Sequence, residues 1–372
     1  MPPMTFERWT NVRPMEISTT LTTSPVADDK LAEILANPGF GAFFTDHMFT
    51  VRWNPGEGWH QPEITPYGPL TLDPATAVFH YAQEIFEGLK AYRHDDGSIW
   101  VFRPEANAER MLRSSRRLAL PELPVDDFVQ AVEALVRVDD RWVPESTGEK
   151  SLYLRPFMIA TDRFLGVRPA EHVTFMVIAS PAGAYFKRGP MPVTLWLTTD
   201  YTRAGRGGMG AAKTGGNYAS SLVAQQEATA HGCDQVVFLD AQEMTYVEEL
   251  GGMNMYFVYA DGRIVTPELG TILEGITRSS IIELAGKMGH QVEERRISID
   301  EWRDGVTSGE ITEVFACGTA AVVTPVGSLK WDGGETPEVA SSGEVTMAVR
   351  QALVDIQYGR ADDTFGWMHR IR

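Results

Sequence analysis

The hydrophobic positions in the first half of the chain change between a strand period and a helix period. Residues 99–103 form a strand-like run that meets Pro104, a favourable first residue for an amphipathic helix reaching toward Leu118. A second helix is expected after Pro124, with its apolar residues on one face: Phe128, Val132, Leu135 and Val136. The apolar run at residues 173–179 predicts a buried strand, and residues 181–192, rich in Gly and Pro, are typical of a linker.

The second half continues this mixture of periods. A strand at residues 193–198 precedes a long glycine-rich loop, which leads into a helix that Asn217 can cap and Gly232 can end. An apolar strand follows at residues 235–239, and residues 253–259 turn at Asp261-Gly262 into residues 263–265, which predicts a hairpin. The pattern therefore predicts a mixed α/β fold.

Two further helices are expected near the end of the chain. One begins near Ile276 and ends at Gly289, with these residues facing inward: Ile281, Leu284, Ala285 and Met288. The other covers residues 345–356. With 372 residues, the chain is long enough for two domains with sizeable cores. We expect a small N-terminal α/β domain over residues 1–181, of which 1–40 stay unassigned, a linker over 182–192, and a large C-terminal domain over 193–372.

Charge and composition narrow the class of protein. A formal net charge of −17 would repel nucleic acid and anionic lipid, so neither is an expected partner. No apolar run reaches the roughly 18 residues that a membrane span needs, and the first residues lack the basic and apolar regions of a signal peptide. We therefore expect a cytoplasmic protein. Two cysteines cannot build a disulfide framework, and no Cys/His cluster has zinc-ligand spacing, so no metal is expected.

The most unusual segment is the glycine-rich loop GRGGMGAAKTGGNYA at residues 205–219. Gly205, Gly207 and Gly210 match a dinucleotide-binding pattern, but that pattern needs a helix opening directly on the glycines. Residues 207–214 resemble a phosphate-binding P-loop, except that Ala212 replaces the required glycine. A third interpretation is that Lys213 forms a Schiff base with an aldehyde cofactor, which glycines allow the backbone to approach. From the loop alone, a surface lysine is equally compatible.

Other segments favour the third interpretation. AAKTGGNYA resembles the branched-chain aminotransferases, a family of fold-type IV pyridoxal-phosphate enzymes. The similarity continues in order along the chain through further motifs: FTDHM, FEGLKAYR, FRPEANAERML, SLYLRP, PAGAYF, EELGGMNMYF, GTILEGITR, FACGTAAVV and IQYG. It covers most of the chain from about Phe44 onward, which is far more specific than one motif. It implies pyridoxal 5′-phosphate bound between two domains, and a homodimer.

The resemblance also assigns cofactor residues. It implies that Lys213 holds the cofactor and then acts as general acid and base, and that Glu249 keeps the pyridine nitrogen protonated. Tyr218 would hydrogen-bond the cofactor's phenolic oxygen. The expected phosphate ligands are the side chains of Arg103 and Thr319 and the backbone N–H groups of Ile276 and Thr277. Individually, each of these residues has a purely structural alternative, such as a surface ion pair for Arg103.

The substrate site follows from the same resemblance. An apolar wall for branched side chains is implied at five positions: Phe44, Tyr81, Phe86, Tyr153 and Tyr185. The substrate carboxylate is expected at the turn of Thr319 and Ala320, and Arg155 would meet the second carboxylate of glutamate. Some family members offer a threonine hydroxyl to the carboxylate where this chain has Gly252.

The resemblance implies reversible ping-pong transfer of the amino group of L-leucine, L-isoleucine or L-valine to 2-oxoglutarate, giving the branched 2-keto acid and L-glutamate. Within the same fold, the alternatives are a D-amino-acid aminotransferase and an aminodeoxychorismate lyase. From other classes, a nucleotide-binding enzyme would use the glycine-rich loop, and a non-enzymatic binding module would use none of these residues chemically.

Overall fold

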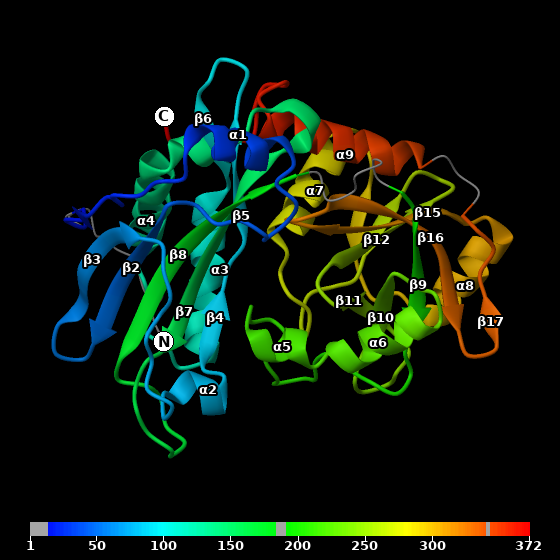
Figure 1. The fold of residues 1–372 in the computed structure, drawn as a ribbon. Coiled ribbons are helices and arrows are strands. Elements are labelled where there is room, and N and C mark those ends of the chain that lie inside the picture. The colour runs from blue at the N-terminus through cyan, green and yellow to red at the C-terminus, as the bar shows by residue number, and fades with distance from the viewer. Residues whose placement is uncertain (1–13, 184–190, 340–342) are drawn as a thin grey trace, which may run out of the picture.

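A computed structural model describes residues 14–183, 191–339 and 343–372. In these ranges the chain builds two mixed β-sheets that lie side by side (Figure 1). The first sheet has the order β1-β3-β2-β8-β7-β5-β6-β18, and β4 pairs with β7 beside this path. Its strands are β1 (Ser18–Thr19), β2 (His47–Asn54), β3 (Gly58–Pro66), β4 (Glu84–Phe86), β5 (Leu89–Arg93), β6 (Ile99–Phe102), β7 (Ser151–Ala160), β8 (Val173–Ala182) and β18 (Met368–Arg370).

The second sheet has the order β11-β10-β9-β16-β15-β12-β13-β14, with β17 paired to β16. Its strands are β9 (Val193–Leu197), β10 (Gln235–Leu239), β11 (Val247–Leu250), β12 (Asn254–Tyr259), β13 (Ile264–Thr266), β14 (Val292–Glu294), β15 (Ile311–Gly318), β16 (Val322–Trp331) and β17 (Gly334–Glu335). The hairpin predicted at Asp261-Gly262 is confirmed, because Phe257 pairs with Val265 in antiparallel register. The mixed α/β fold class is confirmed as well.

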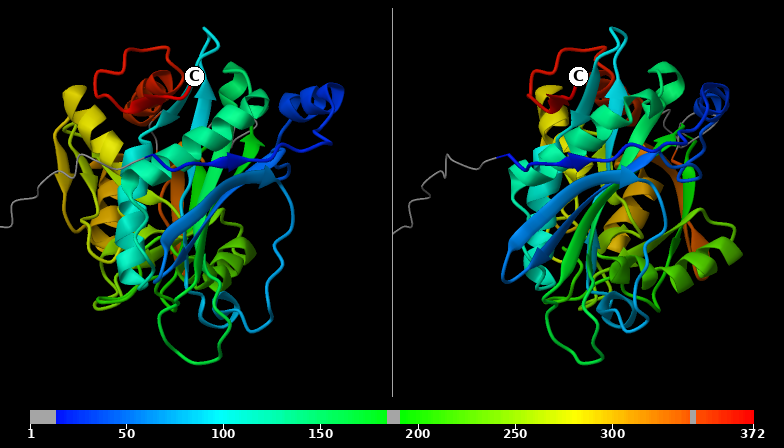
Figure 2. Two further views of the ribbon diagram at one scale, coloured as in Figure 1. Left: turned by 90° about the vertical axis from the view of Figure 1, so that its left-hand side faces the viewer. Right: turned by 60° about the vertical axis from the view of Figure 1, so that its left-hand side comes forward.

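Two helices cover one face of the first sheet, α3 (Pro104–Arg117) and α4 (Val125–Val138) (Figure 2). Pro104 is the first helical residue of α3, as predicted. The predicted apolar face of α4 is buried in the same core. Along β5, Leu89 and Ala91 join this core, so the intervening Lys90 points to the opposite face. Shorter helical segments complete this half: α1 (Asp28–Ala36), α2 (Ala77–Tyr81) and a pair of 3₁₀ turns at Asp140–Trp142 and Thr147–Glu149.

The second sheet is buried on both faces, which explains the continuous apolar strand β12. Helix α8 (Ile299–Ser308) packs on one face, where Trp302 joins Met255 and Phe257 in one core. On the other face, α7 (Ile276–Lys287) and α9 (Glu344–Gln357) pack against Tyr256 and Phe315. The prediction that Met288 faces inward on α7 is wrong. Met288 lies just beyond the helix and is 38% exposed.

The helix expected from Asn217 onward differs from the structure. Two helices stand there, α5 (Gly215–Ala219) and α6 (Leu222–Ala230), and Thr214 rather than Asn217 occupies the N-cap of α5. Asn217 is buried inside α5, where its side-chain amide donates to the carbonyl oxygens of Met209 and Ala212, each at 2.8 Å. Asn217 therefore ties the glycine-rich loop to the helix instead of capping it.

The two sheets are joined by more than the covalent chain. The last strand, β18, pairs with β6 of the first sheet although it follows all strands of the second. The buried Arg110 of α3 donates to both carboxylate oxygens of Glu87, at 2.9 and 2.7 Å, and to the carbonyl oxygen of Glu274 at 3.1 Å. The two-domain division, with its linker over residues 182–192, stays a prediction, and residues 184–190 lie outside the described part. No helix among the described residues is long and apolar enough to span a membrane.

Arg110 offers a test of this connection. Replacing Arg110 with Met should lower the free energy of unfolding by about 3–5 kcal/mol, because Glu87 would keep a buried charge without its partner. Urea unfolding followed by fluorescence measures this. Arg116→Met is the matched control on the same helix, where an exposed Arg116 pairs with Glu122, and it should cause only a slight change. Equal effects of the two substitutions would contradict the structural role of the buried pair.

Candidate functional site

Lys213 lies at the end of the glycine-rich loop, where the two sheets meet. The loop follows β9 of the second sheet, but its end is attached to the first half of the chain. The backbone N–H of Phe86 donates to the carbonyl oxygen of Lys213 at 3.0 Å, and the N–H of Lys213 donates to Ser114 Oγ at 3.0 Å. The carboxylate of Glu84 accepts from the backbone N–H of Gly215 and from the hydroxyl of Thr214. The position of Lys213 is therefore fixed by β4 and α3.

The ammonium group of Lys213 faces aromatic rings. Its Nζ donates to the hydroxyl of Tyr218 at 2.7 Å and lies 4.8 Å from the ring centroid of Phe86. Within the described residues, Lys213 forms no ion pair with a carboxylate. Burial, and then the positive charge of Arg110, lower the pKa of Lys213 to about 8. An amine in such surroundings loses its proton more readily, so a larger fraction of it is neutral near pH 7 and able to act as a nucleophile or to accept a proton.

Glu249 lies on β11 and is buried, with 2% of its surface exposed. Its Oε1 pairs with Arg203 Nη1 at 2.5 Å and accepts from the backbone N–H of Leu273 at 3.1 Å. Both contacts use the same oxygen, and the described residues provide no hydrogen bond to Oε2. Burial raises the pKa of Glu249 to about 7, against the opposing effect of Arg203. The free oxygen can thus receive a hydrogen bond from a ring N–H.

Three of the four residues predicted to hold a phosphate line one small cavity. Ile276 and Thr277, the first two residues of α7, line it together with Thr319. The N–H groups of a first helical turn have no partners within the helix, which makes this end suitable for an anion. Arg103 contacts the next residues along α7, where its Nη1 donates to the hydroxyls of Ser279 and Ser280 at 3.1 and 2.8 Å. Its phosphate role stays a prediction.

Around Lys213, the structure brings together three of the residues predicted for the substrate. Arg155 donates to the hydroxyl of Tyr153 at 3.1 Å and stacks over the ring of Phe86 at 4.8 Å. The Arg155 Nε is buried and has no hydrogen-bond partner within the described part of the chain. Phe86 also contacts the ring of Tyr218, with centroids 5.0 Å apart. Gly88 leaves room for this group, because a Cβ there would overlap the hydroxyl of Tyr153.

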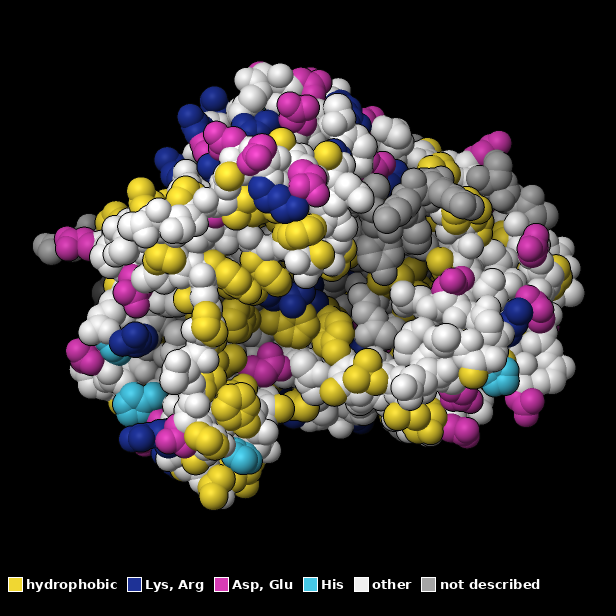
Figure 3. Space-filling view, in the orientation of Figure 1, with side chains coloured by type: hydrophobic (Ala, Val, Ile, Leu, Met, Phe, Trp, Pro, Cys, Tyr) yellow, Lys and Arg dark blue, Asp and Glu magenta, His cyan; other side chains and the backbone are white. Residues whose placement is uncertain are grey.

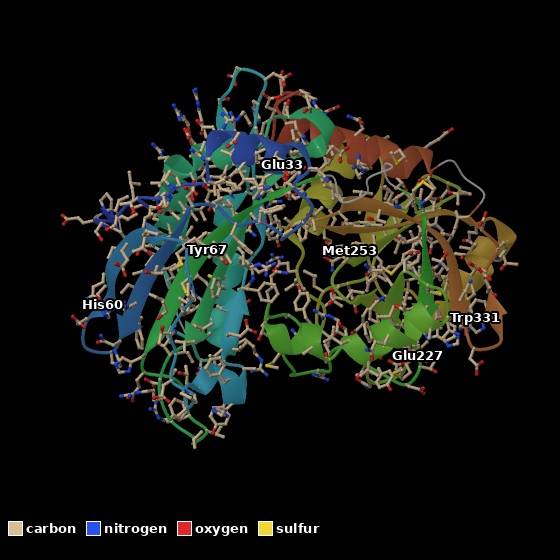
Figure 4. The ribbon with its side chains drawn as sticks, in the orientation of Figure 1. Glu33, His60, Tyr67, Glu227, Met253 and Trp331 are labelled. Atoms are coloured by element: carbon tan, nitrogen blue, oxygen red, sulfur yellow. The ribbon has the colours of Figure 1, made fainter. Side chains whose placement is uncertain are left out.

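The other aromatic positions are arranged differently. Phe44 stacks on Tyr67, which Figure 4 labels beside the first sheet, with centroids 5.0 Å apart. Tyr81 stacks on Phe164 at 6.0 Å and is 36% exposed. Tyr185 lies outside the described residues. The structure therefore does not show these three positions joined to the group around Lys213, and their roles stay predictions.

Gly252 and Ala320 lie in two turns of the second half that approach each other. A Cβ at Gly252 would lie 3.4 Å from the ring of Tyr218, and a Cβ at Gly318 would lie 3.3 Å from the side chain of Met253. Figure 4 labels Met253 close to the space between the sheets. Ala320 accepts a hydrogen bond from Lys90, as described below. In Figure 3 the same side of the molecule is hollowed, with hydrophobic side chains and Lys or Arg side chains lining the hollow.

Several charged residues of this region were not found by sequence reasoning. Arg203 pairs with Glu249. It belongs to a loop whose sequence suggests exposure, and no feature of the neighbouring sequence indicates that Arg203 is buried in an ion pair. Glu84, Glu87 and Lys90 lie in and beside the segment FEGLKAYR, where charges within a short strand pattern were an available signal. No group of three or more His, Cys, Asp or Glu side chains among the described residues is arranged to hold a metal ion.

Comparisons with known proteins agree with this geometry. The model of the family Amino-transferase class IV matches residues 84–329. A probable branched-chain-amino-acid aminotransferase of Streptomyces coelicolor is 59% identical over 93% of this chain and 96% of that protein. The branched-chain-amino-acid aminotransferase of Mycolicibacterium smegmatis is 56% identical over 97% of this chain and 100% of that protein.

Solved structures give the same result. The branched-chain amino acid aminotransferase of Escherichia coli superposes with a TM-score of 0.71 at 28% identity, covering 87% of this chain and 99% of that chain. The T.th. branched-chain amino acid aminotransferase, complexed with N-(5′-phosphopyridoxyl)-L-glutamate, has a TM-score of 0.70 at 28% identity, covering 87% and 98%. The chain therefore belongs to the class IV amino-transferase family, among the branched-chain-amino-acid aminotransferases.

Proposed function

We propose that this chain uses pyridoxal 5′-phosphate to move the amino group of L-leucine, L-isoleucine or L-valine to 2-oxoglutarate, in a reversible ping-pong reaction that gives the branched 2-keto acid and L-glutamate. The observation that carries the proposal is the ammonium of Lys213, which lies against Tyr218 and has no carboxylate partner in the described residues. A lysine with a lowered pKa in such a place is suited to bond covalently with an aldehyde.

The residues present fit the cofactor. The free Oε2 of Glu249 suits a protonated ring nitrogen, the hydroxyl of Tyr218 suits a phenolic oxygen, and the cavity at Ile276, Thr277 and Thr319 suits a phosphate. When bound, the cofactor supplies an electron sink that stabilises negative charge at the substrate α-carbon. The carboxylate of Glu249 keeps that sink effective because it favours the protonated form of the ring nitrogen. Arg203, in turn, holds the other oxygen of Glu249 in place.

Lys213 is placed to carry out the proton transfer. When its Nζ is not bonded to the cofactor, it would accept the proton from the substrate α-carbon and would return a proton to the cofactor carbon. Tyr218 holds Nζ by the 2.7 Å hydrogen bond, and Phe86 excludes water from one side of it. One amine therefore serves both as covalent anchor and as general acid and base.

The substrate side combines apolar and charged surface. Phe86 and Tyr153 provide apolar area for a branched side chain, which gains roughly 0.8 kcal/mol per buried methylene. Arg155 Nε has no hydrogen-bond partner among the residues that the structure describes, and its guanidinium is suited to pair with the second carboxylate of glutamate. For the T.th. relative, structures carry N-(5′-phosphopyridoxyl)-L-glutamate in one case and 4-methylvaleric acid in another. Acidic and aliphatic ligands bind to that one protein, which supports the same pair of substrates here.

We also propose that the enzyme is a homodimer, which the family resemblance implies, and that it is cytoplasmic. A D-amino-acid aminotransferase or an aminodeoxychorismate lyase remains the alternative in the same fold, with a different substrate wall. A nucleotide-binding function is disfavoured, because the glycines at 205–210 precede the first helical residue, Gly215, by several residues.

Glu249→Gln tests the role of the buried carboxylate. The variant should still bind pyridoxal phosphate, but its single-turnover rate with leucine should fall by roughly 10²-fold, because a neutral amide no longer favours the protonated ring nitrogen. Stopped-flow absorbance measures that rate. Glu248→Gln is the matched control, since Glu248 is a buried neighbour bonded to Thr271. An unchanged rate in Glu249→Gln would remove this residue from the mechanism.

Arg155→Met tests the dual substrate site. The barrier for glutamate and 2-oxoglutarate should rise by about 1.5–3 kcal/mol, while leucine and its keto acid change much less, because only the acidic substrates lose a charged partner. The two half-reactions are measured separately by single-turnover kinetics. Arg52→Met, at an exposed ion pair with Glu63, is the control. Equal losses in both half-reactions would make Arg155 a structural residue, and faster turnover of D-alanine than of L-leucine by the unmodified enzyme would contradict the branched-chain assignment.

A further inference from the structure

Lys90 is a buried cation that the proposed reaction leaves without a role. It lies on β5 with 8% of its surface exposed, and it forms no ion pair with any described carboxylate. Its Nζ donates to the carbonyl oxygen of Ala320 at 2.9 Å. Burying an ammonium without an ion-pair partner costs free energy, and an apolar residue at the same place in the strand would not carry that cost. We therefore expect Lys90 to make a specific interaction that offsets it.

The surroundings of Lys90 do not neutralise its charge. The negative charge of Glu149 acts on it, but Glu149 is already paired with Arg350 through two hydrogen bonds, at 2.9 and 2.5 Å. The effects of these two residues on the Lys90 ammonium oppose each other. Lys90 also lines the same cavity as Thr277 and Thr319. Its positive charge therefore faces a region that is built to receive anions.

The turn that Lys90 contacts is conformationally strained. Val322, which follows this turn, has a φ of 61°, a left-handed conformation that a β-branched residue rarely adopts. Such a conformation persists only where surrounding contacts hold the backbone in place. The hydrogen bond from Lys90 Nζ fixes the peptide plane between Ala320 and Ala321 from one side. Gly252 and Met253 approach the start of the turn, at Gly318, from the other side.

We propose that Lys90 is a positioning residue for the substrate carboxylate. The carbonyl oxygen of Ala320 shares its peptide plane with the backbone N–H of Ala321. By holding that oxygen, Lys90 limits rotation within the turn whose N–H groups at Thr319 and Ala320 would bind the carboxylate, and its charge adds to the attraction for that anion. This assignment rests on the proposed function, in which that turn receives the α-carboxylate. It gives the chain a source of carboxylate stabilisation where Gly252 provides no hydroxyl.

A role in holding the cofactor phosphate is the competing assignment, because the two anions would occupy neighbouring places. The hydrogen bond to Ala320 favours the carboxylate, since it ties Lys90 to the turn, whereas no hydrogen bond in the described structure joins Lys90 to α7, which carries the phosphate donors Ile276 and Thr277. The two assignments differ in which ligand loses affinity when the ammonium is removed.

The test compares Lys90→Met, Lys90→Arg and Lys150→Met as holoenzymes. Lys150 is the matched control, because its Nζ also donates to a backbone carbonyl, that of Leu35, at 2.9 Å. Calorimetric titration with 4-methylvalerate, a carboxylate without an amino group, should show a dissociation constant raised by at least about tenfold in Lys90→Met. The dissociation constant should stay within about threefold of the unmodified enzyme in Lys90→Arg, because arginine can still donate to Ala320. It should also stay within about threefold in Lys150→Met, because Lys150 contacts Leu35 and not the turn. The KM for leucine should rise in Lys90→Met while kcat changes little.

The affinity for pyridoxal phosphate, measured on the apoenzymes, separates the alternatives. Weaker cofactor binding with unchanged 4-methylvalerate binding would assign Lys90 to the phosphate and overturn the proposal. Unchanged affinity for both ligands in Lys90→Met would also overturn it. If Lys90→Met does not fold, Lys90→Gln, which keeps a neutral donor, should show a smaller rise in the 4-methylvalerate dissociation constant, and no rise would count against the proposal. An unmodified enzyme that neither binds pyridoxal phosphate nor converts leucine would instead overturn the proposed function itself.

Discussion

The structure of the site depends on one constraint, the placement of the Lys213 ammonium at the junction of two sheets. The lysine belongs to a loop of the second half, yet its backbone is hydrogen-bonded to Phe86 and Ser114 of the first. Gly210 allows the loop to pass close to the backbone of Thr271, because a Cβ at this position would overlap the carbonyl oxygen of Thr271. The aromatic rings of Phe86 and Tyr218 then lie against this amine.

Buried charges around that amine fall into two kinds. Glu87 with Arg110 and Glu249 with Arg203 are paired, and each pair fixes the position of a segment or an oxygen. Lys213 and Lys90 have no carboxylate partner within the described residues, which leaves the Lys213 amine to the aldehyde of the cofactor and the Lys90 ammonium to an anionic ligand. Because an uncompensated buried charge is costly, an anionic group gains more from Lys90 than it would from a lysine at the surface. The site is thus arranged to be complete only when its ligands are present.

Sequence patterns predicted the fold class, the helices at Pro104 and Val125 and the hairpin at Asp261-Gly262, because periodicity and turn residues are local properties. The class of enzyme followed from motifs that can be read directly from the sequence in their order along the chain. Sequence patterns failed at Asn217, where an amide bonded to a preceding loop instead of capping a helix. They also missed Arg203, whose pairing with Glu249 joins a loop to a separate strand. Contacts of this kind depend on the packing of elements distant in the sequence, and neither propensity nor spacing encodes them.

The most direct test of the account asks where the cofactor is attached. The chain is incubated with pyridoxal phosphate, treated with borohydride to reduce a carbon–nitrogen double bond to a stable amine, digested and analysed by mass spectrometry. The account predicts the phosphopyridoxyl group on the peptide that contains Lys213, together with its absence in Lys213→Ala and a loss of transamination by orders of magnitude in that variant. A label on another lysine, or full turnover without Lys213, would contradict it.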